Sequence, residues 1–146
     1  MELGLVLPAS EPSADGLRRL SFDRILAVAE RADRLGFHSL WWFDHFFVEA
    51  TPGRRTGSFE CWTLLSAIAT QTSRAFLGSL VLCNSPRQAA LVAKRAASLQ
   101  EISNGRVLLG LGASWHERCG LMMSSSRSRR ERQRSGSPPP VNACCV

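Results

Sequence analysis

Residues 76–112 read FLGSLVLCNSPRQAALVAKRAASLQEISNGRVLLGLG. The segment opens with an apolar run, and such runs are typical of strands buried in a parallel sheet. Apolar residues then recur at helical spacing over residues 89–102, with Pro86 expected in the first helical turn. Asn104-Gly105 supplies a left-handed cap, and a second apolar run follows. The stretch therefore predicts a strand, a helix and a second strand.

The same alternation of strand and helix extends toward the N-terminus. Ser21 is a suitable N-cap, and Gly36 a suitable stop, for the helix between them. Polar segments that contain proline or glycine separate the apolar runs and are expected to be loops. The elements expected before residue 76 are strands over residues 3–7 and 38–43, helices over 22–35 and 60–70, and loops over 9–19 and 47–58.

Four strands that alternate with three helices predict an α/β fold with a parallel sheet. Because crossovers between parallel strands are right-handed, two architectures remain. One is an open doubly wound sheet. The other is the N-terminal half of a (β/α)8 TIM barrel, in which the strands lie in the order 1-2-3-4. A strand order of 3-2-1-4 would instead identify the doubly wound fold.

The charge of the chain is concentrated near its C-terminus. The 146 residues are 45% hydrophobic and 21% charged, as expected for a globular protein. Residues 119–146 hold five arginines and one glutamate, which gives four of the six net positive charges. This Arg-, Ser- and Pro-rich segment is expected to be a disordered tail behind a domain spanning residues 1–118. The absence of a long apolar run and of a signal peptide predicts a cytoplasmic protein without a membrane span.

Polar residues follow three of the predicted strands, at the end of the sheet where ligands of parallel α/β folds gather. They are Asp44-His45, Asn84-Ser85 and Ser114–Glu117. Structural alternatives stay open, since Asp44 could satisfy loop amides, His45 could be a packed histidine and Asn84 could cap a helix. Among the five cysteines, Cys61 and Cys83 are expected to be reduced core thiols. Because no cysteine spacing or histidine partner fits a zinc site, no metal is expected.

Three segments resemble the luciferase-like monooxygenase superfamily, and most closely its branch that uses coenzyme F420. They are residues 39–46 (SLWWFDHF), 78–87 (GSLVLCNSPR) and 105–117 (GRVLLGLGASWHE). The resemblance covers residues 2–118. It implies a (β/α)8 barrel about twice as long as this chain. It also implies hydride transfer between F420, or alternatively the flavin FMN, and a small organic substrate.

The resemblance further implies roles for residues at the strand ends. In the family, a non-prolyl cis peptide bond often follows the third strand, which would place it here at Cys83–Asn84 or an adjacent bond. The residue with an implied catalytic role is His45, and those with implied cofactor contacts are Asp44, Cys83, Asn84, Gly112, Ala113 and Ser114.

Strands five to eight of such a barrel have no counterpart in this sequence, and the resemblance ends near Cys119. We therefore expect a chain truncated by a frameshift near Arg118 or Cys119, with open sheet edges and no activity in isolation. One alternative is a non-catalytic structural fragment that completes a barrel as a homo-oligomer. Another is a nucleic-acid binder acting through the basic tail, although that tail lacks interleaved aromatic residues.

Overall fold

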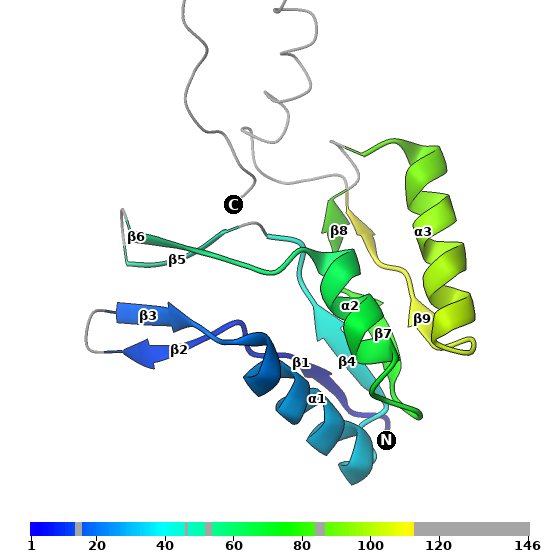
Figure 1. Cartoon of the computed structure of the whole chain (residues 1–146), viewed down its shortest axis with the longest axis horizontal. Coiled ribbons are helices and arrows are strands. Elements are labelled where there is room, and N and C mark those ends of the chain that lie inside the picture. The colour runs from blue at the N-terminus through cyan, green and yellow to red at the C-terminus, as the bar shows by residue number, and fades with distance from the viewer. Residues whose placement is uncertain (14–15, 46, 52–53, 84–86, 113–146) are drawn as a thin grey trace, which may run out of the picture.

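The chain folds around a parallel four-stranded sheet (Figure 1). The computed structural model describes residues 1–13, 16–45, 47–51, 54–83 and 87–112. The sheet strands pair in the order in which they occur in the chain, so the predicted sequential order is confirmed and the doubly wound alternative is excluded. The four strands are β1 (Gly4–Val6), β4 (Ser39–Trp42), β7 (Phe76–Ser79) and β9 (Val107–Leu108).

Helix α1 (Phe22–Leu35) forms as the sequence predicts. The Ser21 hydroxyl accepts a hydrogen bond from the Arg24 N–H at 3.4 Å, which satisfies one of the free donors of the first turn. Gly36 ends the helix with a φ of +83°, in the left-handed region that favours glycine.

Helices α2 (Cys61–Ala69) and α3 (Ala89–Ile102) follow the second and third sheet strands. The Glu60 carboxylate caps α2 by accepting the Thr63 N–H at 2.8 Å. Helix α3 begins at Ala89 with Gln88 as its N-cap, and Pro86, expected in the first turn, lies outside the described residues. The predicted cap at the other end is confirmed, since Asn104-Gly105 has φ values of +54° and +85°.

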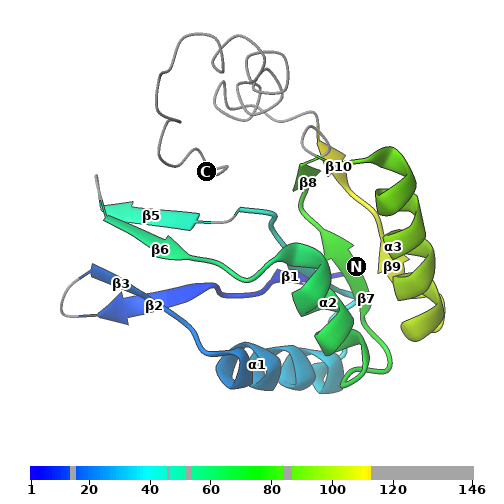
Figure 2. The same ribbon diagram turned by 45° about the horizontal axis from the view of Figure 1, so that its top comes forward.

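Alternate residues of the sheet strands face the helices and form the core. Leu40 and Trp42 of β4 and Leu77 of β7 are fully buried, in one cluster with Ile25 of α1 and Ile68 of α2. The helices lie on this side of the sheet in both views (Figure 2). The described residues thus make a sheet covered by helices on one face, as in the wall of a barrel.

The opposite face of the sheet corresponds to the interior of a barrel. The Trp41 indole covers its middle, because a Cβ built on Gly78 would stand 2.3 Å from the indole ring and one on Gly4 would stand 2.7 Å from Nε1. Outside that area the face is open, and the side chains of Val6 and Val81 are about half exposed. The described strands therefore leave apolar surface that closure of a barrel would bury.

The third and fourth predicted strands are each interrupted. Their distal parts, β8 (Leu82–Cys83) and β10 (Leu111–Gly112), form a separate parallel pair. Between the β7–β9 pair and the β8–β10 pair, the Ser79 hydroxyl donates to the Gly110 carbonyl at 2.9 Å and accepts the Gly110 N–H at 3.1 Å. A non-prolyl cis peptide bond joins Leu80 and Val81, upstream of the Cys83–Asn84 position implied by the resemblance.

Two hairpins occupy segments expected to be loops, so those two expectations are wrong. Strands β2 (Ser10–Ser13) and β3 (Gly16–Arg19) form the first hairpin, and β5 (Phe47–Thr51) and β6 (Arg54–Gly57) form the second. The hairpins extend side by side from the ends of β1 and β4 (Figures 1 and 2). They contain proline and glycine, residues that are depleted in strands, and backbone pairing overrides that weak local preference.

At the other end of the sheet, Asp33 and Arg106 hold the turn between α2 and β7. The Asp33 carboxylate accepts the N–H groups of Ser73, Arg74 and Ala75 at 3.1, 3.0 and 2.6 Å. The Arg106 guanidinium donates to the carbonyls of Ala69, Thr72 and Ala75. Burial raises the pKa of Asp33, but the three N–H groups and Arg106 outweigh it and hold that pKa below its ordinary value.

None of the helices in the described ranges is long and apolar enough to cross a membrane. The predicted disordered tail, residues 119–146, lies outside the described residues.

Candidate functional site

The carboxyl ends of β4, β8 and β10 meet at one edge of the sheet. Asp44 directly follows β4, and its Oδ2 accepts the backbone N–H of Cys83 at 2.9 Å. Cys83 is in turn the register partner of Gly112 in the β8–β10 pair. Three of the residues implied as cofactor contacts therefore lie together, as expected for the ligand-binding end of a parallel sheet.

Arg87 completes this arrangement, although sequence reasoning gave it no role. Its Nη1 donates to Asp44 Oδ2 at 2.6 Å, and its Nη2 donates to Asp44 Oδ1 at 2.9 Å. Nη1 also donates to the Cys83 carbonyl at 2.7 Å. The Asp44 side chain is 2% exposed and that of Arg87 is 10% exposed. Arg87 thus pairs with a buried charge and ties the end of β4 to the end of β8.

Glu60 lies on the far side of Arg87, with its Oε1 3.6 Å from Arg87 Nη2. Burial raises the pKa of Asp44; the Cys83 N–H and Arg87 oppose this shift, and the Glu60 charge adds to it. For Glu60 itself, burial raises the pKa, but the hydrogen bonds from Thr63 and Trp62 and the charge of Arg87 outweigh it, so the pKa is lowered. Beneath the strand ends, the two carboxylates thus share one guanidinium, with the closer contacts made to Asp44.

His45, the implied catalytic residue, directly follows Asp44. Its ring is half-buried and stands 5.3 Å from that of Phe43, centroid to centroid. The remaining residues with implied cofactor contacts, Asn84, Ala113 and Ser114, lie outside the described residues.

Two glycines shape the surface next to Cys83. A Cβ built on Gly112 would stand 2.6 Å from Cγ2 of Val81, and one on Gly110 would stand 2.2 Å from the Ser79 carbonyl oxygen. The half-exposed Val81 side chain therefore packs against bare backbone. An apolar side chain beside bare backbone is a surface on which a flat aromatic ring could lie, so this edge fits the ring system of F420 or FMN.

The cysteines near the site are thiols. Cys61 and Cys83 are both free, as predicted, and Cys61 is fully buried whereas Cys83 is half-buried. Burial raises the pKa of Cys61, and the charges of Asp44 and Glu60 add to that shift. In the described part of the chain, no three His, Cys, Asp or Glu residues are grouped so that they could hold a metal ion.

Comparison with known proteins identifies relatives that use F420 or FMN. The F420-dependent glucose-6-phosphate dehydrogenase of Amycolatopsis mediterranei is 36% identical over 92 residues, which are 61% of this chain and 26% of that protein. The F420-dependent hydroxymycolic acid dehydrogenase of Mycobacterium tuberculosis is 32% identical over 112 residues, which are 72% of this chain and 31% of that protein. The chain therefore spans about a quarter to a third of the length of these relatives.

The fold of this chain also matches part of a solved structure. The oxygenating constituent of 3,6-diketocamphane monooxygenase from Pseudomonas putida, solved in complex with FMN, matches with a TM-score of 0.64 and 26% identity. The match covers 84% of this chain and 32% of that one. The family model described as luciferase-like monooxygenase matches residues 1–133. This chain belongs to the luciferase-like monooxygenase family.

Proposed function

We propose that this chain forms the first strands of an F420-dependent oxidoreductase that transfers hydride to or from a small organic molecule. The two F420-dependent relatives support the choice of cofactor. The FMN-bound monooxygenase supports FMN, and oxygenation, as the alternative. The observation that carries the proposal is the meeting of Asp44, Cys83 and Gly112 at the ligand-binding edge of a family fold.

In this proposal, Asp44 and Arg87 position the site and do not themselves react. Both Asp44 oxygens are engaged, and the side chain is almost fully buried. Asp44 holds the Cys83 N–H, and Arg87 holds the Cys83 carbonyl. The pair thereby fixes the backbone of β8, beside which the ring of the cofactor would lie against Val81 and Gly112.

When bound, F420 supplies the carbon that gives or accepts the hydride. We assign to His45 the proton that accompanies it. In the reduction of a carbonyl to an alcohol, a protonated His45 imidazole would give its proton to the carbonyl oxygen. The position of His45 supports this role, because its half-buried ring directly follows Asp44 at the end of β4.

We further propose that residues 1–146 are inactive in isolation. Val6 and Val81 are half exposed on the inner face of the sheet, and Leu109 and Leu111 are exposed at its edge. Each large apolar side chain left in water forfeits about 1.5–3 kcal/mol of stabilisation. Association with a second copy would cover part of this surface, which favours a structural, self-associating state as the second candidate. The frameshift near Arg118 or Cys119 stays a prediction that the nucleotide sequence of the coding region tests.

Fluorescence titration with F420 and with FMN tests the proposed function. We expect both cofactors to bind residues 1–146 more weakly than micromolar, with F420 preferred. A monodisperse monomer that binds F420 at micromolar affinity would contradict inactivity in isolation. Tighter binding of FMN than of F420 would overturn the choice of cofactor.

A further inference from the structure

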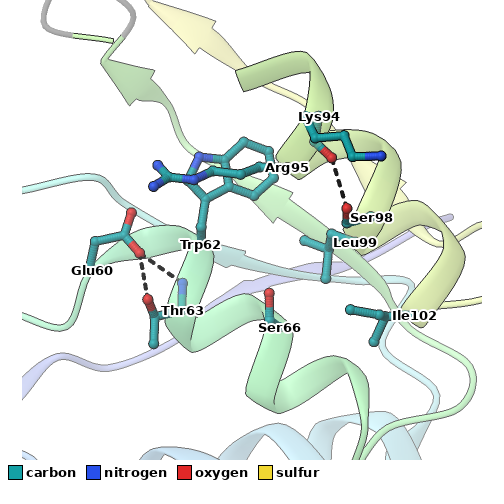
Figure 3. Close-up of a pocket in the computed structure, with 9 residues that line it drawn as sticks. All are labelled: Glu60, Trp62, Thr63, Ser66, Lys94, Arg95, Ser98, Leu99 and Ile102. Atoms are coloured by element: carbon teal, nitrogen blue, oxygen red, sulfur yellow. Dashed lines mark hydrogen bonds between the residues drawn. The ribbon is translucent and has the colours of Figure 1, made fainter. Parts of the chain in front are cut away.

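A concave surface lies between α2 and α3, on the helix side of the sheet (Figure 3). This groove has a volume of about 250 Å³. It combines polar side chains at one end with apolar side chains at the other. The residues used below are Glu60, Trp62 and Ser66 from α2 and its cap, and Arg95, Leu99 and Ile102 from α3.

The groove contains a buried donor that has no acceptor among the described residues. Trp62 is 6% exposed, and its indole Nε1–H is fully buried without a hydrogen-bond partner. An indole nitrogen can only donate. A buried donor of this kind is normally satisfied by a protein group, a water or a ligand. The acceptor for the Trp62 N–H is therefore not one of the described residues.

Arg95 adds a positive charge beside this donor. In Figure 3 its side chain extends from α3 toward the Trp62 indole, whereas the Lys94 ammonium points away. The Arg95 guanidinium makes no ion pair or hydrogen bond with the described residues, and the residue is exposed. Two kinds of donor, one charged and one neutral, thus line the same end of the groove.

Glu60 is the one acid among the described residues that line the groove, against two cations, Lys94 and Arg95. Its Oε2 accepts the N–H and the hydroxyl of Thr63, both at 2.8 Å, and its Oε1 lies 3.6 Å from Arg87. Oε2 is thus satisfied, whereas Oε1 is buried without a hydrogen-bond partner in the described part of the chain and shares the Arg87 charge with Asp44. At the other end of the groove, Leu99 is fully buried in the wall, and the half-exposed Ile102 offers apolar surface.

We propose that the groove between α2 and α3 binds the carboxylate of a small organic acid with a hydrocarbon tail. The carboxylate accepts hydrogen bonds from Trp62 Nε1–H and from the Arg95 guanidinium, an arrangement that satisfies both donors. The tail lies along Ile102, whose half-exposed apolar side chain it covers. This site shares Glu60 with the charged residues beneath the strand ends, but neither proposal depends on the other.

The test is a titration of the ¹⁵N-labelled chain with hexanoate, followed through the Trp62 indole N–H resonance, which Trp62→Phe identifies. Arg95→Gln removes the proposed charge, and Arg31→Gln, on the exposed side of α1, is the matched control. We expect a saturable shift of the Trp62 resonance. Arg95→Gln should weaken hexanoate binding about ten-fold, equivalent to about 1.4 kcal/mol, and Arg31→Gln should leave it unchanged.

Three results would overturn the proposal. One is a Trp62 resonance that hexanoate does not move. A second is an equal effect of the two arginine variants, or of sodium chloride at matched ionic strength, which would indicate general screening. The third is a shift that follows protein concentration instead of hexanoate, which would show that a second copy of the chain covers the groove.

Discussion

Asp44 and Arg87 lie 43 residues apart in the chain, yet their side chains form a two-pronged ion pair with N–O distances of 2.6 and 2.9 Å. The pair is buried at the end of the sheet where β4, β8 and the segment leading to α3 meet. Because an arginine fork matches the two oxygens of a carboxylate, this contact sets direction as well as distance.

Arg87→Met should be strongly destabilising. It would leave the Asp44 carboxylate buried without a counter-charge, a change that typically costs about 3–5 kcal/mol. Urea unfolding, followed by circular dichroism at a fixed protein concentration, measures the free energy of unfolding. Arg87→Lys should lose less, since it keeps the charge but not the fork.

Arg31→Met, at an exposed position of α1, is the control for Arg87→Met and should change stability by no more than about 0.5 kcal/mol. If Arg87→Met and Arg31→Met lose the same stability, the buried pair does not stabilise the strand ends as described.

The lowered pKa of Asp33 predicts that the folded chain loses stability in acid. Its folded-state pKa lies below the ordinary value of 3.8, so its contribution to stability is present above that value and is lost as the pH falls through the folded-state pKa. Asp33→Asn removes this contribution. The difference in unfolding free energy between the parent chain and Asp33→Asn should therefore shrink between about pH 5 and about pH 2. Asp23→Asn, on the exposed first turn of α1, is the control. A difference that stays constant with pH would contradict this role of Asp33.

Gly110→Ala should disrupt the junction between the β7–β9 pair and the β8–β10 pair. The added methyl would stand 2.2 Å from the Ser79 carbonyl oxygen, a backbone atom that cannot move aside cheaply. We expect a loss of about 1–3 kcal/mol or more, as for other overpacked positions. Gly57→Ala, which meets open space in β6, is the control and should change stability by at most about 0.5 kcal/mol. Equal unfolding midpoints for the two variants would rule out the close approach of Gly110 to Ser79.

The uncovered sheet predicts self-association of the isolated chain. Light scattering should show species larger than a monomer, with an average mass that rises with concentration. Val6→Ser and Leu111→Ser together should reduce association, because they remove half-exposed apolar groups from the inner face and the edge. Leu35→Ser removes an exposed apolar group from the end of α1 and should have no effect. A parent chain that is a monodisperse monomer with a cooperative melt would refute this prediction.

The sequence was sufficient to predict the elements that have strong local signals. Runs such as residues 38–43 predict strands because apolar side chains fill both faces of a buried sheet. Ser21, Gly36 and Asn104-Gly105 predict helix ends through cap chemistry that depends on only a few neighbouring residues. The order of the sheet strands followed once the resemblance favoured a barrel over a doubly wound fold.

Local sequence signals could not predict the hairpins or the role of Arg87. The hairpin strands carry proline and glycine, and their pairing depends on a partner strand that local propensity does not register. Arg87 follows a proline in a segment that looks like a helix start, where an arginine is ordinarily a surface residue. Only the folded chain brings it to Asp44, 43 positions earlier.

The proposed role of these strands as the cofactor-facing part of an F420 enzyme can be tested in a chimera. Residues 1–112 replace the aligned segment of the Amycolatopsis F420-dependent dehydrogenase, and the dissociation constant of F420 is measured by fluorescence titration. We expect the folded chimera to bind F420 within about ten-fold of the parent dehydrogenase, and Arg87→Met in the chimera to weaken binding by about ten-fold or more. A chimera that folds with native-like helical content but does not bind F420, or binds FMN in its place, would contradict the proposal.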